Sequence, residues 1–147
     1  MRAFFLASVL ATPALGAGLQ CDPGRMNCSP LVACIEESGE YFRGASFGQD
    51  AGPLQATSVT GAVCTGTWRR TLMGIGIAEF TCDDGRVGSS VFNWFEPESG
   101  TAVGHGSFAD GSVARFWAGN NLERYFREID PLERERMACN PVDMLLS

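Results

Sequence analysis

The chain has 147 residues, 45% of them hydrophobic, and carries a formal net charge of −6 at pH 7. An acidic chain makes a poor partner for phosphate groups, which need clustered cations, so the composition argues against nucleic-acid binding. All eleven basic residues are arginine, a bias toward G and C in the coding sequence that favours a bacterial source.

Residues 1–17 have the features of a secretory signal peptide. Arg2 supplies a positive charge, a short apolar run follows, and Gly16 and Ala17 are small residues suited to cleavage. The apolar run is too short to span a bilayer, and no later segment approaches that length. We therefore expect cleavage after Gly16 or Ala17, no transmembrane anchor, and one domain over residues 18–147 in the periplasm or outside the cell.

Six cysteines follow this segment, an even number that predicts three disulfides in an exported chain of this size. No pair has the CxxC spacing of a zinc site and the single histidine is distant from the first three cysteines, so we expect no metal. The cysteines are Cys21, Cys28, Cys34, Cys64, Cys82 and Cys139.

Ser29 and Pro30 predict the start of a short N-terminal helix that ends at Gly39. Serine is a good N-cap and proline suits the first helical position. Leu31 and Cys34 would then share the face that docks on the core.

From residue 41 to 118 the sequence has the rhythm of consecutive antiparallel hairpins, because glycines, β-branched residues and aromatics alternate between regular turn signals. We predict a mainly β domain: an antiparallel meander of about six to seven strands, forming a sheet or a partly open barrel, with short N- and C-terminal helices. The predicted strands lie near residues 41–47, 54–60, 62–69, 74–82, 86–95, 101–108 and 112–118. The C-terminal helices begin at the capping residues Asn121 and Asp130.

Two hairpins have a predicted register. A hairpin centred on Met73 places Gly66 opposite Phe80 and Cys64 opposite Cys82, which predicts a disulfide between these cysteines. The other four cysteines would then pair the N-terminal region with itself and with the tail.

The second hairpin turns at Asp110-Gly111, because Asp-Gly favours a two-residue turn. That turn sets Phe108 opposite Val113 and Gly106 opposite Arg115. In both hairpins a glycine lies beneath a large side chain, as expected when a bulky neighbour covers a bare backbone.

A short pattern occurs twice: Gly74-Ile75-Gly76, Phe80 and Asp84-Gly85 recur as Gly104-His105-Gly106, Phe108 and Asp110-Gly111. The pattern resembles MORN repeats over about a third of the chain, which implies stacked hairpins that act as a scaffold or binding surface without catalysis. Gly66-Thr67-Trp68 also resembles the opening of lipocalin-type and avidin-type barrels. Only about fifty residues of strand follow it, too few for seven further strands, so we do not predict that fold.

Four residues are candidates for catalysis: His105, Asp83, Asp84 and Asp110. Histidine titrates near neutral pH and carboxylates serve as general acids or bases. Aspartates are also ordinary turn residues, and His105 suits a sheet surface opposite Phe116. We therefore predict no catalytic residue and no cofactor, and keep a small hydrolase built on these residues as the alternative.

The candidate binding residues are aromatic: Trp94, Phe95 and Trp117. Large aromatics in sheets are usually core, but Trp94 and Phe95 beside an acidic turn also suit an exposed patch for a glycan or protein. Alternation does not decide between these, because both faces of the strand at 86–95 carry apolar residues. The sequence predicts an exported, non-catalytic binding or scaffold module that acts on a protein or envelope component.

The disulfide framework predicts that the secreted protein has no free thiol. Its intact mass should not change on alkylation without reductant, and it should gain six alkyl groups after reduction. Alkylation of two or more cysteines in the unreduced protein would contradict the framework.

Overall fold

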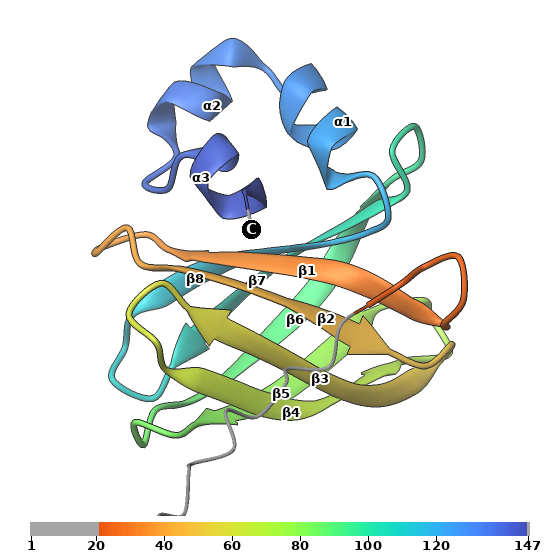
Figure 1. Cartoon of the computed structure of the whole chain (residues 1–147), viewed down its shortest axis with the longest axis horizontal. Coiled ribbons are helices and arrows are strands. Elements are labelled where there is room, and N and C mark those ends of the chain that lie inside the picture. Colours follow the sequence, from red (N-terminus) through yellow and green to blue (C-terminus); the bar gives the residue numbers. More distant parts are fainter. Residues whose placement is uncertain (1–20, 147) are drawn as a thin grey trace, which may run out of the picture.

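The computed structural model describes residues 21–146, which form a closed barrel of eight antiparallel strands with three helices on its outer surface (Figure 1). Consecutive strands pair in sequence order, and β1 pairs with β8 to close the sheet. The expected signal peptide lies outside the described residues. The strands are β1 (Cys28–Ile35), β2 (Tyr41–Phe47), β3 (Ala51–Ser58), β4 (Val63–Arg70), β5 (Gly76–Cys82), β6 (Val87–Glu96), β7 (Thr101–Phe108) and β8 (Val113–Ala118).

The barrel corrects two predictions, because it has eight strands and is closed. The additional strand is β1, where the sequence predicted a helix. Every residue from Leu31 to Ile35 is buried, since Ala33 faces the barrel core and Val32 faces the helical layer. A short run that is apolar on both faces does not show the alternation of a half-buried strand, so periodicity alone does not separate it from a buried helix.

The predicted register of the β4–β5 hairpin is confirmed. Gly66 lies opposite Phe80, and Cys64 lies opposite Cys82 and is bonded to it. The remaining cysteines pair as expected, in the bridges Cys21–Cys28 and Cys34–Cys139. The second of these bonds the C-terminal tail to the outer face of β1.

The predicted register of the β7–β8 hairpin is wrong by one residue. The loop is Ala109–Gly111, three residues rather than two, and the Phe108 N–H donates to the Ser112 carbonyl across it at 3.0 Å. Gly111 takes a φ of 90°, which closes this loop type. Gly106 therefore lies opposite Ala114 rather than the predicted arginine.

One end of the barrel is closed by a charged side chain. The Arg86 guanidinium donates two hydrogen bonds to Glu40, at 2.8 and 2.9 Å, and one to Asp84 at 2.9 Å. It lies 5.4 Å above the ring of Phe42 and 5.3 Å above that of Phe108. The paired and stacked arginine seals the apolar core beneath it.

The three helices are α1 (Leu122–Glu128), α2 (Pro131–Arg136) and α3 (Pro141–Leu145). The predicted caps are confirmed, because the Asn121 and Asp130 side chains accept hydrogen bonds from the first turns of α1 and α2. Within residues 21–146, no helix is long and apolar enough to cross a membrane.

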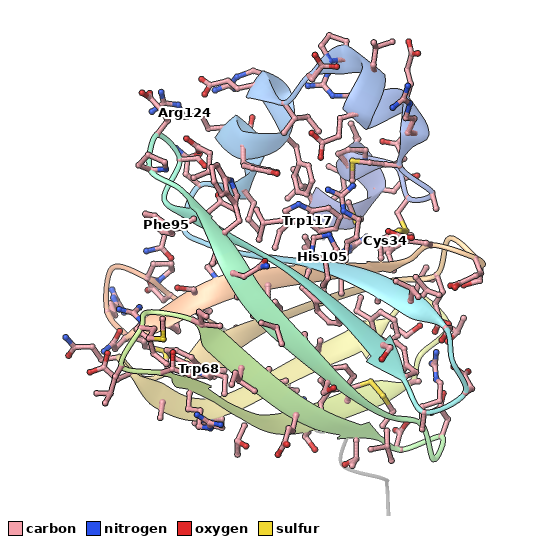
Figure 2. All side chains as sticks on the ribbon, turned by 180° about the vertical axis from the view of Figure 1, so that it is seen from behind. Cys34, Trp68, Phe95, His105, Trp117 and Arg124 are labelled. Carbon is pink, nitrogen blue, oxygen red and sulfur yellow. A yellow bond between two sulfur atoms is a disulfide. The ribbon has the colours of Figure 1, made fainter. Side chains whose placement is uncertain are left out.

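The helices cover the outer face of β1, β7 and β8 (Figure 1). Trp117 of β8 lies between the barrel and the helices, 1% exposed, with its ring 5.2 Å from that of Phe126 (Figure 2). Met144 of α3 is fully buried in the same cluster. This side of the barrel is therefore packed on both faces.

Inward-facing glycines allow the strands to coil tightly enough to close the barrel. A Cβ atom built on Gly66 would lie 1.9 Å from the carbonyl oxygen of Glu79, and one on Gly106 would lie 2.1 Å from that of Ser89. No side chain fits at these distances. Glycine kinks of this kind introduce the curvature that closed β-barrels need.

Gly66→Ala should lower the free energy of unfolding by about 3 kcal/mol or prevent folding, because the added methyl group overlaps backbone. Gly24→Ala is the matched control, since a Cβ there meets only the Asp22 side chain at 3.4 Å. Chemical denaturation of the oxidised proteins measures both. Equal stability of the two variants would contradict the close approach.

Glu40 should make stability depend on pH. The hydrogen bonds from Arg86, helped by those from Ser58 and Thr60, lower the pKa of Glu40 in the folded protein. The stabilisation is therefore present above about pH 4.3, the pKa of a glutamate in the unfolded chain. It is lost as the pH falls through the lower pKa that Glu40 has in the folded protein. Glu40→Gln should cost about 2 kcal/mol at pH 7. Urea denaturation measures the difference in free energy of unfolding between the wild type and Glu40→Gln. If this difference does not shrink toward pH 3, Glu40 does not have this role.

Candidate functional site: the barrel cavity

The barrel contains a cavity of about 720 Å³ that opens at the end opposite Arg86. Residues of the β2–β3, β4–β5 and β6–β7 loops line its mouth. This volume is within the range of small-molecule binding sites in proteins. The larger apolar side chains of its wall are Leu31, Phe42, Leu54, Trp68, Phe80, Phe92, Phe108 and Phe116.

The cavity exists because many inward-facing positions hold small residues. An eight-stranded barrel is just wide enough for ordinary side chains to fill it. Here several strands place alanine at inner positions, at Ala33, Ala56, Ala78, Ala102 and Ala118. The aromatic residues between them form walls and leave the space near the mouth open.

Trp68 forms a fixed part of the wall. Its indole N–H donates to the Phe47 carbonyl at 2.7 Å, which ties β4 to the end of β2. The ring packs on the core cluster and remains partly exposed to the cavity. The ring is thus in place before any ligand enters.

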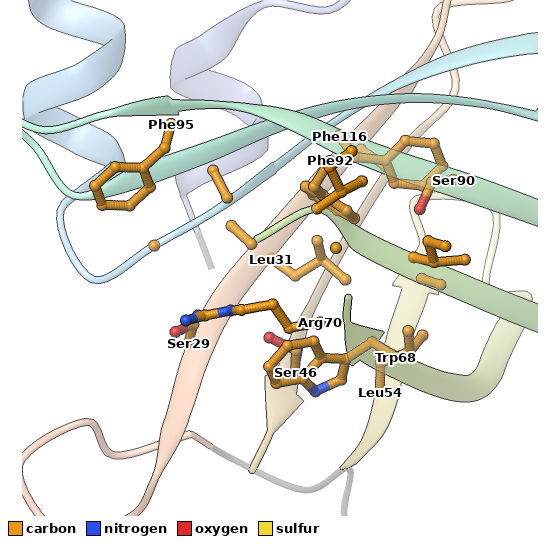
Figure 3. A pocket seen from close by; sticks show the side chains of 18 of the residues that line it. Ser29, Leu31, Ser46, Leu54, Trp68, Arg70, Ser90, Phe92, Phe95 and Phe116 are labelled. Atoms are coloured by element: carbon orange, nitrogen blue, oxygen red, sulfur yellow. The ribbon is translucent and has the colours of Figure 1, made fainter. Parts of the chain in front are cut away.

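Ser90 of β6 is a polar residue in the apolar inner part of the cavity. It lies opposite Ala78 and Gly106 on the neighbouring strands and is 2% exposed. Neighbouring atoms of the wall cover its oxygen, and no group among the described residues forms a hydrogen bond with it. A buried hydroxyl without a partner costs about 1–3 kcal/mol. Figure 3 shows this oxygen on the side of the cavity remote from the mouth.

Arg70, the last residue of β4, lies at the mouth (Figure 3). Its Nη1 is 3.9 Å from Oδ1 of Asp50, and the two side chains are 55% and 75% exposed. An exposed ion pair at this distance contributes little. Ser29 and Ser46 add two hydroxyl groups to the lining. The mouth therefore offers a cation that is only loosely paired.

Four exposed apolar residues, Leu72, Met73, Trp94 and Phe95, form what we call the apolar rim. A bulge in β6 places Phe95 opposite Ala102, on the inner face, and Trp94 opposite Val103, on the outer face. Trp94 is 63% exposed and Phe95 60%, as the exposed-patch alternative requires. Their role in binding remains a prediction, and Trp117, the third predicted binding residue, is a core residue beneath the helices.

The structure does not bring His105 to the cavity. The residue is exposed on the outer face of β7, opposite Val91 and Arg115 rather than the predicted Phe116. It is not among the residues that line the cavity. The hydrolase alternative therefore lacks its histidine at this cavity.

The three candidate aspartates lie in turns at the closed end. Asp83 accepts the Val63 N–H at 3.0 Å. Hydrogen bonds from Arg86 lower the pKa of Asp84, and those from Ser112 lower the pKa of Asp110. General acid–base catalysis near neutral pH needs a carboxyl pKa that is raised. The pKa values of Asp84 and Asp110 are lowered instead. Each of the three aspartates has a structural role in its turn.

No protein-family model and no curated protein sequence matches the chain. Three solved β-barrels are similar in structure. A de novo designed fluorescence-activating barrel is 13% identical with a TM-score of 0.50, over 65% of this chain and 92% of that one. Two redesigned barrels bound to DFHBI, mFAP1 and mFAP0, are 11% identical with TM-scores of 0.51 and 0.50, over 65% of this chain and 94% and 97% of theirs. At this identity the likeness shows the fold alone.

The sequence analysis missed Arg70 and Ser90. The signal for Ser90 was present in the β5–β6 hairpin. If the loop Asp83–Gly85 is given three residues, as in the hairpin centred on Met73, Ser90 falls opposite Ala78. The position opposite an inward alanine also faces inward, so the serine would have been placed inside the barrel.

Proposed function

We propose that the protein is a non-catalytic binding module whose barrel cavity holds a small amphipathic molecule of the cell envelope. The observation that carries the proposal is the cavity of about 720 Å³, open at one end, with aromatic walls. Concave sites with mostly apolar walls and a few placed polar groups are typical of small-molecule binding.

The pre-formed wall supports this proposal. Trp68 is held by its hydrogen bond to Phe47, and Phe92 packs against Phe116 with ring centroids 6.1 Å apart. A ligand that enters has little side-chain order to impose, which lowers the entropic cost of binding. A redesigned barrel of the same fold is bound to the small molecule DFHBI, so this architecture is compatible with such a ligand.

The disulfides and the apolar rim support an envelope location. Three bridges among the described cysteines are typical of oxidising compartments, and residues 1–17 have the pattern of an export signal. The apolar rim lies beside the mouth, on the β4–β5 loop and the end of β6. Exposed apolar side chains at that place give an amphipathic molecule a surface to contact before it reaches the cavity.

The oxidised protein should bind N-phenyl-1-naphthylamine, a neutral dye that fluoresces in apolar surroundings. Ala102→Trp places a large ring inside the mouth and should weaken dye binding at least tenfold. His105→Ala, on the outer face of the same strand, is the matched control and should bind as the wild type does.

Two measurements test this prediction. Fluorescence titration gives the affinities, and thermal unfolding with and without the dye shows whether the dye stabilises the folded state, as a ligand of that state must. A wild-type protein that neither binds the dye nor gains stability from it would refute the cavity as a binding site. The same holds if Ala102→Trp stays folded and binds as tightly as the control.

A further inference from the structure

The cavity lining contains two charged side chains, Arg70 and Asp50, among the described residues. Among the described lining residues, Arg70 is the only cation and Asp50 the only anion. A guanidinium carries five N–H donors in a planar fork, and the contact with Asp50 at 3.9 Å engages one nitrogen loosely. Arg70 therefore keeps donors for a second acid group.

The neighbourhood of Arg70 favours an anionic ligand group over a cationic one. The hydroxyls of Ser29 and Ser46 line the same part of the cavity and are able to donate hydrogen bonds to an acid oxygen. Asp50 lies in the β2–β3 loop with its side chain 75% exposed, where water screens its charge. A planar acid that pairs with the guanidinium fork gains two aligned hydrogen bonds, which Asp50 does not make.

Among the described residues that line the inner part of the cavity, Ser90 has the one buried side-chain polar atom without a hydrogen-bond partner. Ser90 is buried among the apolar walls, and Phe92, two residues nearer the mouth, separates it from Arg70 on the inner surface (Figure 3). The polar groups thus lie at two levels of the cavity with apolar wall between them.

We infer that the ligand is an anionic amphiphile that binds in one orientation, with its acid group on Arg70 at the mouth and a hydroxyl or carbonyl group on Ser90 inside, once rotation of the serine side chain turns its hydroxyl into the cavity. This inference rests on the proposed function and adds the chemical class of the ligand. The apolar middle of the molecule lies against Trp68, Phe92 and Phe116.

Displacement of bound N-phenyl-1-naphthylamine tests the inference. The competitors are decanoate, decan-1-ol and 10-hydroxydecanoate at pH 7, which share an alkyl chain and differ in the groups at its ends. The flexible chain adapts to the shape of the cavity. Comparing decanoate with decan-1-ol tests the contact of the acid group with Arg70 at the mouth. Comparing 10-hydroxydecanoate with decanoate tests the contact of the hydroxyl group with Ser90 in the interior.

Arg70→Gln should weaken binding of decanoate about tenfold and that of decan-1-ol less than twofold, because only the acid forms charge-assisted hydrogen bonds. Arg69→Gln is the matched control: its side chain is exposed on the opposite face of the same strand, outside the cavity lining. This variant should bind decanoate and decan-1-ol as tightly as the wild type does. Asp50→Asn should strengthen binding of decanoate, since it frees Arg70 and removes a like charge.

Ser90→Ala should weaken binding of 10-hydroxydecanoate about fivefold and leave decanoate unchanged. The free variant should be at least as stable as the wild type, because the hydroxyl has no partner within the described chain. This stability measurement separates loss of a ligand contact from loss of fold.

The outcomes distinguish this inference from the function on which it rests. If the wild type binds the dye but Arg70→Gln affects decanoate and decan-1-ol alike, or Ser90→Ala affects both acids alike, the inference is wrong and the cavity remains a binding site. Failure of all three competitors to displace the dye also overturns the inference. Failure of the dye to bind overturns the proposed function itself.

Discussion

The close approach of backbones at inward-facing glycines is the constraint on which the rest of the structure depends. At Gly66 and Gly106 the neighbouring strand occupies the space of a side chain, so these strands coil more tightly than a flat sheet allows. Tight coiling brings β8 back to β1 and closes the barrel. Closure removes the exposed edges of an open sheet and encloses the interior in which the cavity lies.

Closure leaves the barrel with two unlike ends and two unlike sides. Arg86, paired with Glu40 and stacked on Phe42, fills one end, and the loops that line the mouth of the cavity lie at the other. The helices bury the outer face of β8, and the Cys34–Cys139 bridge fixes them there. The outer faces of β4 to β6 remain open to solvent at many positions. The mouth, with its apolar rim, is the place where the interior meets solvent.

The sequence predicted most of the strands, the presence of three disulfides and the Cys64–Cys82 bridge, because turn glycines and the pairing within one hairpin are local signals. It expected the other two bridges within the N-terminal region and between that region and the tail, and left their exact partners open. It did not predict β1, whose apolar residues are buried on two faces by elements distant in the chain. It also did not predict closure, because Gly66-Thr67-Trp68 was taken as the opening of a barrel, whereas it lies in the fourth strand. Ser90 was missed because its inward direction depends on the register of the β5–β6 hairpin, which a one-residue change in loop length reverses. Arg70 lies in the correctly predicted β4–β5 hairpin, on the face of β4 that carries Trp68, but the sequence did not show that this face lines a cavity.

The polar groups at the two ends of the barrel favour the cavity over the closed end as the candidate site. At the closed end the Glu40 carboxylate accepts hydrogen bonds from Arg86, Ser58 and Thr60, so a ligand would have to break contacts that the fold already makes. In the cavity the Ser90 hydroxyl has no partner among the described residues, and Arg70 has only a distant one. A bound molecule gains most where the free protein leaves donors unsatisfied, because it restores hydrogen bonds without displacing others.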